Sequence, residues 1–268
     1  MSSIDQPFVI NLVLSFVVGS VWITAITVIA ERFGSKIGGF IGGLPSTIVI
    51  ALLFIGITQS AQEASQAAVM IPLVMGVNGI FIVIYLATVR RGVGWGLFSA
   101  VVFWFITTGL IVFAGLDDLR TSIIGWLIML VVIFYITEHV MLIDSRKGLK
   151  VPYTMQRILG RGVVSGVIIS MSVLVSRLAG PVIGGIYSTF PVIFSSTLYI
   201  TYRTGGADFS RAVAKALTLS GMINVGVYAI VGHFAYQHTG LLFGTLISIL
   251  VSGFSASFSY RIIQRLTR

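Results

Sequence analysis

The sequence has no cysteine among its 268 residues and very few charged side chains. The lack of cysteine excludes disulfides, thiolate metal ligands and a cysteine nucleophile. Charged residues make up 9% of the chain and hydrophobic residues 56%, a balance that excludes a soluble domain and is typical of a membrane protein with several spans. The net charge of +9 is then explained first by the cytoplasmic bias of Lys and Arg, so no nucleic-acid partner is expected.

Apolar segments fill almost the whole chain. A spanning helix needs about 20 mostly apolar residues. We therefore predict an all-α, multi-pass protein of the inner cell membrane, with about nine spans over roughly 8–30, 36–58, 64–88, 93–115, 121–143, 161–179, 181–203, 210–233 and 239–260. The first of these segments follows Asp5 and no basic residue, which is not the pattern of a cleaved signal peptide.

The basic residues favour one orientation of these spans. With the N-terminus outside, the cytoplasmic segments hold 15 of the 17 Lys and Arg residues, and only Arg120 and Arg177 lie outside. Acidic residues gather on that outer side, at Asp5, Glu63, Asp117 and Asp118. The sequence therefore predicts an outside N-terminus and a cytoplasmic C-terminus.

An internal duplication divides the chain. Residues 37–78 recur without a gap 146 positions later, so that Pro45 corresponds to Pro191 and Asn78 to Asn224. We predict two four-span repeats, 1–118 and 161–268, joined by a connector span and a basic loop over 119–160. An odd number of spans separates the starts of the repeats. The second repeat should therefore be inverted relative to the first, as in many transporters.

Proline near the middle of the second and seventh spans predicts a broken helix in each repeat, because proline removes a backbone donor and clashes with the preceding turn. Freed backbone groups are tolerated there only against protein or a watery cavity, and a helix that begins at a break presents its positive end. We predict a substrate-binding site at the repeat interface made of Gly42, Gly43, Pro45, Ser46, Thr47, Asn78, Ser188, Thr189, Pro191, Ser195 and Asn224. The alternative is ordinary proline kinks, with small residues for helix packing and asparagines in structural hydrogen bonds.

Glu138 and His139 are the ionisable residues well inside the connector span. Glu138 is a candidate for proton coupling, although a pair so near the cytoplasmic interface more often snorkels or forms a salt bridge. The spans with the breaks and those that follow them have no Asp or Glu near the membrane centre, which favours neutral or anionic cargo. The basic loop over 144–157 either binds anionic lipid headgroups or only sets topology.

Motifs for enzymatic chemistry are absent from the sequence. The Gly-Gly pairs lack the Lys-Ser/Thr of a phosphate loop, and there is no HExxH, Ser-His-Asp or clustered carboxylate pattern. We expect no catalytic activity, cofactor or metal, and predict a secondary transporter for a small neutral or anionic solute or amphiphile. Alternatives are a small-ion channel, a lipid flippase or scramblase, and a non-transporting scaffold. Expected partners are membrane lipids and the small-molecule or ion substrate, and the sequence leaves homo-oligomerisation open.

Each repeat also resembles a known family. The second repeat runs from Gly184-Gly185-Ile-Tyr-Ser-Thr-Phe-Pro191 to the polar loop and helix start Gly205-Gly-Ala-Asp208-Phe-Ser-Arg211, and the first has Gly42-Gly-Leu-Pro45-Ser-Thr. This pattern resembles the small GlpM-type membrane proteins, bacterial chains of about four spans with a Gly-rich, proline-broken early helix. The resemblance covers spans 2 to 4 and 7 to 9, and it implies architecture without any functional residue.

Overall fold

The computed structural model describes residues 5–32, 45–141, 143 and 154–266, and every regular element in these ranges is helical. The elements are α1 (Gln6–Arg32), α3 (Ser46–Thr58), α4 (Ala61–Ala68), α5 (Ile71–Thr88), the 3-10 turn η1 (Val89–Arg91), α6 (Val93–Phe113), α7 (Leu119–Tyr135), the π-helical turn η2 (Ile136–Val140), α8 (Met155–Ala179), α9 (Pro181–Ser188) and α10 (Val192–Leu266). Two residues of the predicted site, Gly42 and Gly43, lie outside the described ranges.

Glycines divide α10 into three helical segments. The backbone is non-helical at Gly205, Gly206 and Gly240, which leaves helices over 192–204, 207–239 and 241–266. Gly206 and Gly240 have φ of 73° and 75°, a left-handed conformation that residues with a Cβ rarely adopt. The chain can therefore reverse at these two positions without a long loop.

The span expected over 64–88 differs from the prediction, because it consists of two helices. α4 ends at Ala68, and α5 restarts at Ile71 with Pro72 in its first turn. Proline has no amide to donate and fits a helix best in that turn. The corresponding position in the second half is Thr218, which lies inside the continuous segment 207–239. The physical cause of the difference is thus a single proline.

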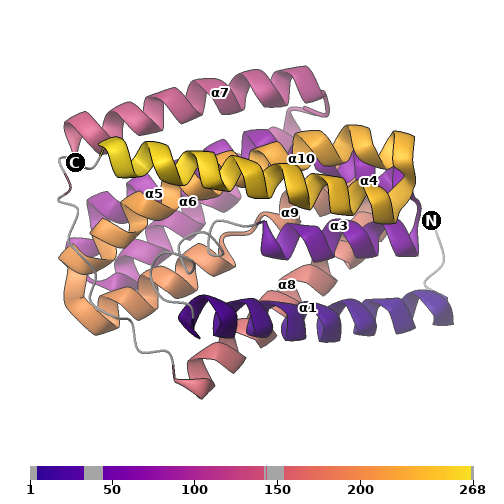
Figure 1. Cartoon of the computed structure of the whole chain (residues 1–268), viewed down its shortest axis with the longest axis horizontal. Helices are drawn as coiled ribbons and strands as arrows, with labels where there is room; N and C mark the ends of the chain where they lie inside the picture. The colour runs from indigo at the N-terminus through magenta and orange to yellow at the C-terminus, as the bar shows by residue number, and fades with distance from the viewer. Residues whose placement is uncertain (1–4, 33–44, 142, 144–153, 267–268) are drawn as a thin grey trace.

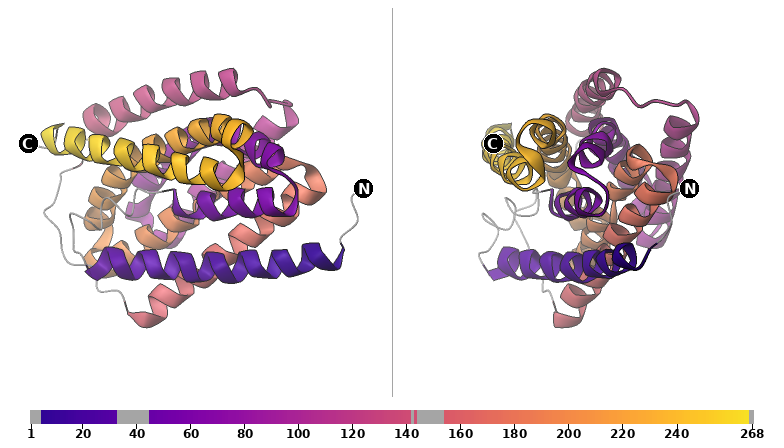
Figure 2. Two further views of the ribbon diagram at one scale, coloured as in Figure 1. Left: turned by 45° about the vertical axis from the view of Figure 1, so that its right-hand side comes forward. Right: turned by 90° about the vertical axis from the view of Figure 1, so that its right-hand side faces the viewer.

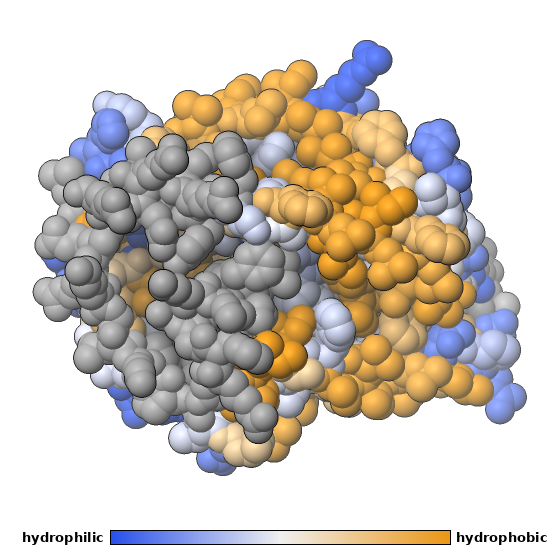
Figure 3. All heavy atoms as spheres, in the orientation of Figure 1, coloured by the Kyte–Doolittle hydropathy of each residue, from blue (hydrophilic) through white to orange (hydrophobic). Residues whose placement is uncertain are grey.

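The surface of the described helices suits a lipid environment. Within the described ranges, five single helices and the longer helical stretch Pro181–Ser257 are long and apolar enough to cross a membrane. Large hydrophobic side chains are exposed on the outer helices, for example Phe98 of α6, Leu127 of α7 and Phe254 of α10. On the face drawn in Figure 3, hydrophobic residues cover a broad area, and hydrophilic residues lie mostly around its margins. The chain is therefore a helical protein with the surface of a multi-pass membrane protein.

The centre of the molecule is formed by α5 together with α3 and parts of α10. Within the apolar window of α5, 72% of the residues are buried inside the protein, against 17% for α7. α6, α7 and α10 pack around α5. α7 lies along one side of the molecule, and α1 and α8 cross on the opposite side (Figures 1 and 2).

Small residues allow α1 and α8 to approach closely. A Cβ added at Gly166 would lie 2.7 Å from the backbone carbonyl oxygen of Phe16, and one at Gly162 would lie 2.8 Å from that of Ser20. Two glycines four residues apart on one helix face are a common basis of helix packing in membranes. This interface joins the first helix of the chain to the first helix after the basic loop.

Candidate functional site

A helix break lies between α9 and α10. α9 ends at Ser188, residues 189–191 are not helical, and α10 begins at Val192 directly after Pro191. The hydroxyls of Ser188 and Thr189 donate hydrogen bonds of 2.6 Å to the carbonyls of Gly185 and Ile186. The Thr189 amide also bonds the Ile186 carbonyl at 3.1 Å, so the hydroxyls add to the backbone bonds that close the end of α9. The helix predicted over 181–203 is therefore interrupted at its proline.

The second proline has a similar place at the start of α3. Pro45 occupies the N-cap position of α3 and provides no side-chain hydrogen bond to the helix. Ser46 is the first helical residue, and the first regular backbone bond runs from the Val49 amide to the Pro45 carbonyl. The amides of Ser46, Thr47 and Ile48 therefore have no acceptor within their own helix.

The starts of α3 and α10 meet at one small cavity of about 50 Å³. This central cavity holds about one or two waters at liquid density. None of its described lining residues is ionisable. They are Pro45, Ser46, Thr47 and Ile48 from α3, Met75 and Asn78 from α5, and Thr189, Phe190, Pro191, Ile193, Phe194, Gly221 and Val225 from the break and α10.

Asn78 connects α5 to the break between α9 and α10. Its side-chain nitrogen Nδ2 donates a hydrogen bond of 2.9 Å to the carbonyl oxygen of Thr189 and lies 3.4 Å from the sulfur of Met75. The residue is 2% exposed, and its Oδ1 has no hydrogen-bond partner. Because a carbonyl only accepts, the bond to Thr189 determines which end of the amide is the donor. Asn78 thus leaves one buried acceptor unpaired beside the central cavity.

Asn224 occupies a different environment in the described part of the chain. Its side chain contacts the hydroxyls of Ser220 and Ser255 at 3.3 and 3.2 Å, and its backbone carbonyl accepts a hydrogen bond of 2.9 Å from Ser252. These contacts join segment 207–239 of α10 to segment 241–266. Asn224 is not among the described lining residues, although its neighbour Val225 is. Its role in a shared site stays a prediction.

The remaining predicted residues divide between the cavity and its surroundings. Pro45, Ser46, Thr47, Thr189 and Pro191 line the cavity together with Asn78. Ser188 and Ser195 are close in sequence but are not among the lining residues. The Oγ of Ser195 is buried without a hydrogen-bond partner.

Seven described lining residues were not part of the predicted site. They are Ile48, Met75, Phe190, Ile193, Phe194, Gly221 and Val225. The offset of 146 residues relates Met75 to Gly221, so the duplication indicates that these two residues occupy equivalent positions in the two halves. A Cβ at Gly221 would lie 2.6 Å from the ring of Phe194, and glycine therefore leaves room for that ring. The two phenylalanines carry no such signal, because aromatic residues are common throughout membrane spans.

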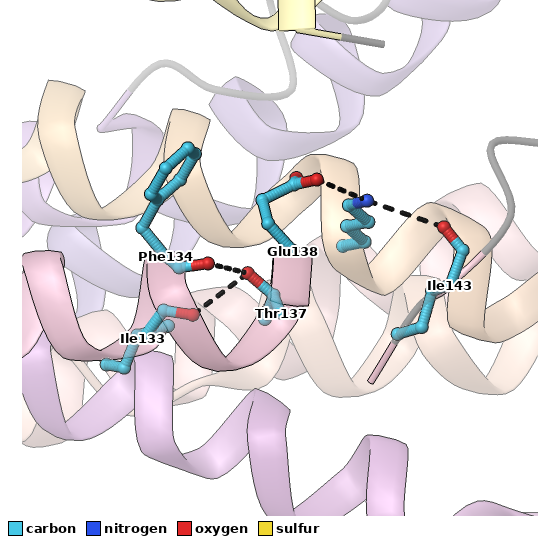
Figure 4. A network of polar contacts seen from close by, with 6 residues as sticks. Ile133, Phe134, Thr137, Glu138 and Ile143 are labelled. Carbon is cyan, nitrogen blue, oxygen red and sulfur yellow. Dashed lines mark hydrogen bonds and ion pairs between the residues drawn. The ribbon is translucent and has the colours of Figure 1, made fainter. Parts of the chain in front are cut away.

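Glu138 lies in an ion pair away from the central cavity. Its carboxylate is 2.9 Å from the Nζ of Lys215, which also donates a bond of 3.4 Å to the carbonyl of Ile143 (Figure 4). The side chains of Lys215 and Glu138 are 11% and 18% exposed. Glu138 belongs to η2, and the neighbouring Thr137 hydroxyl bonds the carbonyls of Ile133 and Phe134. The geometry fits the salt-bridge alternative.

A second, larger hollow of about 280 Å³ lies where α6 ends and α9 begins. Its described lining is mostly apolar and includes Leu116, Asp117, Pro181 and Ile186. The only ionisable residue of that described lining is Asp117. This hollow contains none of the residues predicted from sequence, and Ile186 lies on the helix that leads into the break.

Comparison with known proteins gives one partial similarity. The family described as "Protein of unknown function (DUF3147)" matches residues 12–117. This range extends from α1 to the turn between α6 and α7, and it covers less than half of the chain. No curated protein and no solved structure matches the sequence. The similarity is therefore to a family whose function is not defined.

Proposed function

We propose that the protein is a secondary transporter for a small neutral or anionic solute, with the central cavity as its binding site. The observation that carries this proposal is the convergence of two proline-started helices and the buried side chain of Asn78 on one cavity. Transporters commonly place their sites where paired interrupted helices meet near the membrane centre. The DUF3147 similarity neither adds to this proposal nor opposes it.

The positions of the helices support a repeated architecture. Adding 146 to the bounds of α3 gives 192–204, which is the first segment of α10. The same shift takes α4 and α5 to 207–234, within the segment 207–239, and takes α1 to 152–178, close to α8. We infer two repeats of four spans each, joined by α7.

Contacts between helix ends support the inverted orientation of these repeats. Arg90 and Asp208 approach to 3.9 Å, and both belong to segments predicted to be cytoplasmic. The side chain of Gln59 donates a bond of 2.8 Å to Ser176, and both lie at predicted outer ends. Pairs assigned to the same side of the membrane thus meet in the structure, as inverted repeats require, while the outside position of the N-terminus rests on the distribution of Lys and Arg alone.

The electrostatics of the cavity favour a neutral or negatively charged cargo. Helix N-termini carry a partial positive charge, and the first turns of α3 and α10 both line the cavity. The described lining has no carboxylate that would stabilise a cation. A metal ion or protonated amine would therefore lose its hydration without a compensating charge.

Transport is tested with purified protein in proteoliposomes, by measuring uptake of small polar solutes as a function of concentration. We expect saturable uptake by the wild type and a loss of at least tenfold per folded molecule in Asn78→Leu. Asn11→Leu is the matched control, because it makes the same substitution on α1 at a residue outside the cavity lining. Equal uptake by all three proteins and by empty vesicles would refute the proposal.

A small-ion channel is a second candidate, favoured by the small volume of the cavity. About 50 Å³ is sufficient for a single monatomic ion. Flux separates the two functions, because a carrier is limited to ordinary turnover of at most about 10³ per second. Electrical recording from the same reconstituted protein would detect the faster, unsaturated flux of a channel.

A further inference from the structure

Asn78, which lines the central cavity, has one hydrogen-bond acceptor that the protein itself does not satisfy. Asn78 is 2% exposed, its Nδ2 is engaged by the Thr189 carbonyl, and its Oδ1 faces no donor. A buried polar atom without a partner is costly, and most such atoms in proteins are paired. A ligand that fits this place must therefore bring an O–H or N–H group of its own.

The cavity also offers several hydrogen-bond donors. The first turns of α3 and α10 line it, and no described residue accepts a bond from the amides of Thr47, Ile48 or Ile193. The hydroxyls of Ser46 and Thr47 likewise have no partner among the described residues. Each helix N-terminus is equivalent to about half a positive charge. Two of them outweigh the opposite partial charge at the end of α9, which reaches the cavity at Thr189, and no described lining residue is ionisable.

We propose that the cavity binds a small monovalent oxyanion that retains one O–H group, with bicarbonate as the representative of this class. The negatively charged oxygens accept hydrogen bonds from the helix amides and hydroxyls, while the O–H donates to Oδ1 of Asn78. A cavity of about 50 Å³ suits a group of few non-hydrogen atoms. This inference rests on the proposed function, since it names the cargo class of the same site.

Nitrate provides a close comparison, because it is planar, carries one negative charge and has the same number of non-hydrogen atoms as bicarbonate, but lacks the O–H. The thermal stability of the purified protein is measured in detergent against increasing sodium bicarbonate, sodium nitrate or formamide, in sealed vessels at pH 8 and constant ionic strength. A ligand that binds the folded state raises the melting temperature, and at a given concentration the rise grows with the logarithm of its affinity. We expect bicarbonate to bind about tenfold more tightly than nitrate, because nitrate leaves Oδ1 unpaired.

Variants then assign the effect to one side chain. In Asn78→Leu, the affinities for bicarbonate and nitrate should differ by no more than about twofold. In Asn11→Leu, the tenfold difference in affinity should remain. Equal affinities in the wild type would overturn the O–H contact, and this comparison holds even if Asn78→Leu fails to fold. No binding by either anion would overturn the anion class.

Two further outcomes separate this inference from the transport proposal. Formamide is neutral and carries both a donor and an acceptor. If it binds more tightly than both anions, the anion assignment is wrong, while a transporter of neutral solutes remains. If bicarbonate binds selectively but labelled bicarbonate does not cross proteoliposome membranes faster than in empty vesicles, the site is correct and the transport function is wrong.

Discussion

Replacement of Asn78 by leucine tests whether this side chain serves the site or only the fold. The substitution removes the bond from Nδ2 to the Thr189 carbonyl and also removes the unpaired Oδ1. The first change leaves a carbonyl unsatisfied, which costs about 1–3 kcal/mol, and the second removes a penalty of about the same size. The two terms nearly cancel. We therefore expect the free energy of unfolding to change by less than about 1 kcal/mol.

Replacement by aspartate has a different balance. Asn78→Asp keeps an unpaired oxygen, places the other oxygen against the Thr189 carbonyl and adds a charge at a position that is 2% exposed. A carboxylate near the middle of a membrane helix costs about 2.5–3.5 kcal/mol. We expect a loss of about 3 kcal/mol, or uptake of a proton that avoids it. The aspartate variant should thus be much less stable than the leucine variant.

Unfolding titrations in mixed micelles give both stability changes, and solute uptake per folded molecule gives the functional change. We expect a stable but inactive leucine variant and an unstable, inactive aspartate variant. If Asn78→Leu lowers the free energy of unfolding by more than about 3 kcal/mol and the remaining folded protein transports normally, Asn78 serves only to stabilise the fold. The assignment of its Oδ1 to a ligand would then be wrong.

Three further predictions concern packing, an ion pair and a helix cap. Gly185→Ala places a Cβ against a backbone carbonyl of α4 and should lower the free energy of unfolding by about 1–3 kcal/mol, whereas Gly160→Ala in α8 meets nothing within 4 Å and should be neutral or stabilising. A double-mutant cycle of Glu138→Gln with Lys215→Met should give a coupling of about 1 kcal/mol, and zero coupling would show that this pair is not formed. Hydrogen bonds from the start of α7 lower the pKa of Asp118 below its usual value, so its capping contribution is present above a pH of about 3.9 and is lost as the pH falls through the lower folded-state pKa. Amide exchange in the first turn of α7 should increase at that acidic pH in the wild type and be independent of pH in Asp118→Asn once the intrinsic exchange rate is removed.

Local features of the fold could be predicted from sequence because their causes are local. The break before α10 follows from Pro191, and the start of α7 follows from Asp118, whose carboxylate accepts a bond of 2.8 Å from the Thr121 amide. The division of the third span follows from Pro72, although its counterpart in the second half, Thr218, is not a proline. A proline acts on its own helix whether or not a repeat conserves it.

Contacts between distant segments could not be predicted in the same way. The sequence predicts Asn78 either in a shared site with Asn224 or in a structural hydrogen bond, and neither prediction identifies its partner, the Thr189 carbonyl, 111 residues away. Lys215 was counted only as a cytoplasmic charge, and it forms the ion pair that occupies Glu138. Helix periodicity indicates which face of a helix is apolar. It does not state which other helix supplies a hydrogen-bond partner to that face.

The central cavity is asymmetric in a way that bears on how such a protein selects its cargo. On the α3 side, the first turn presents the hydroxyls of Ser46 and Thr47, whereas the first turn of α10 presents Ile193 and Phe194 at the cavity. In a symmetric pair of identical repeats, both sides would carry the same groups and a bound solute would have two equivalent orientations. The divergence of the proposed repeats leaves polar contacts on one side and apolar contacts on the other. A solute with one charged edge and one O–H group therefore has a single preferred orientation, in which the O–H points to Asn78.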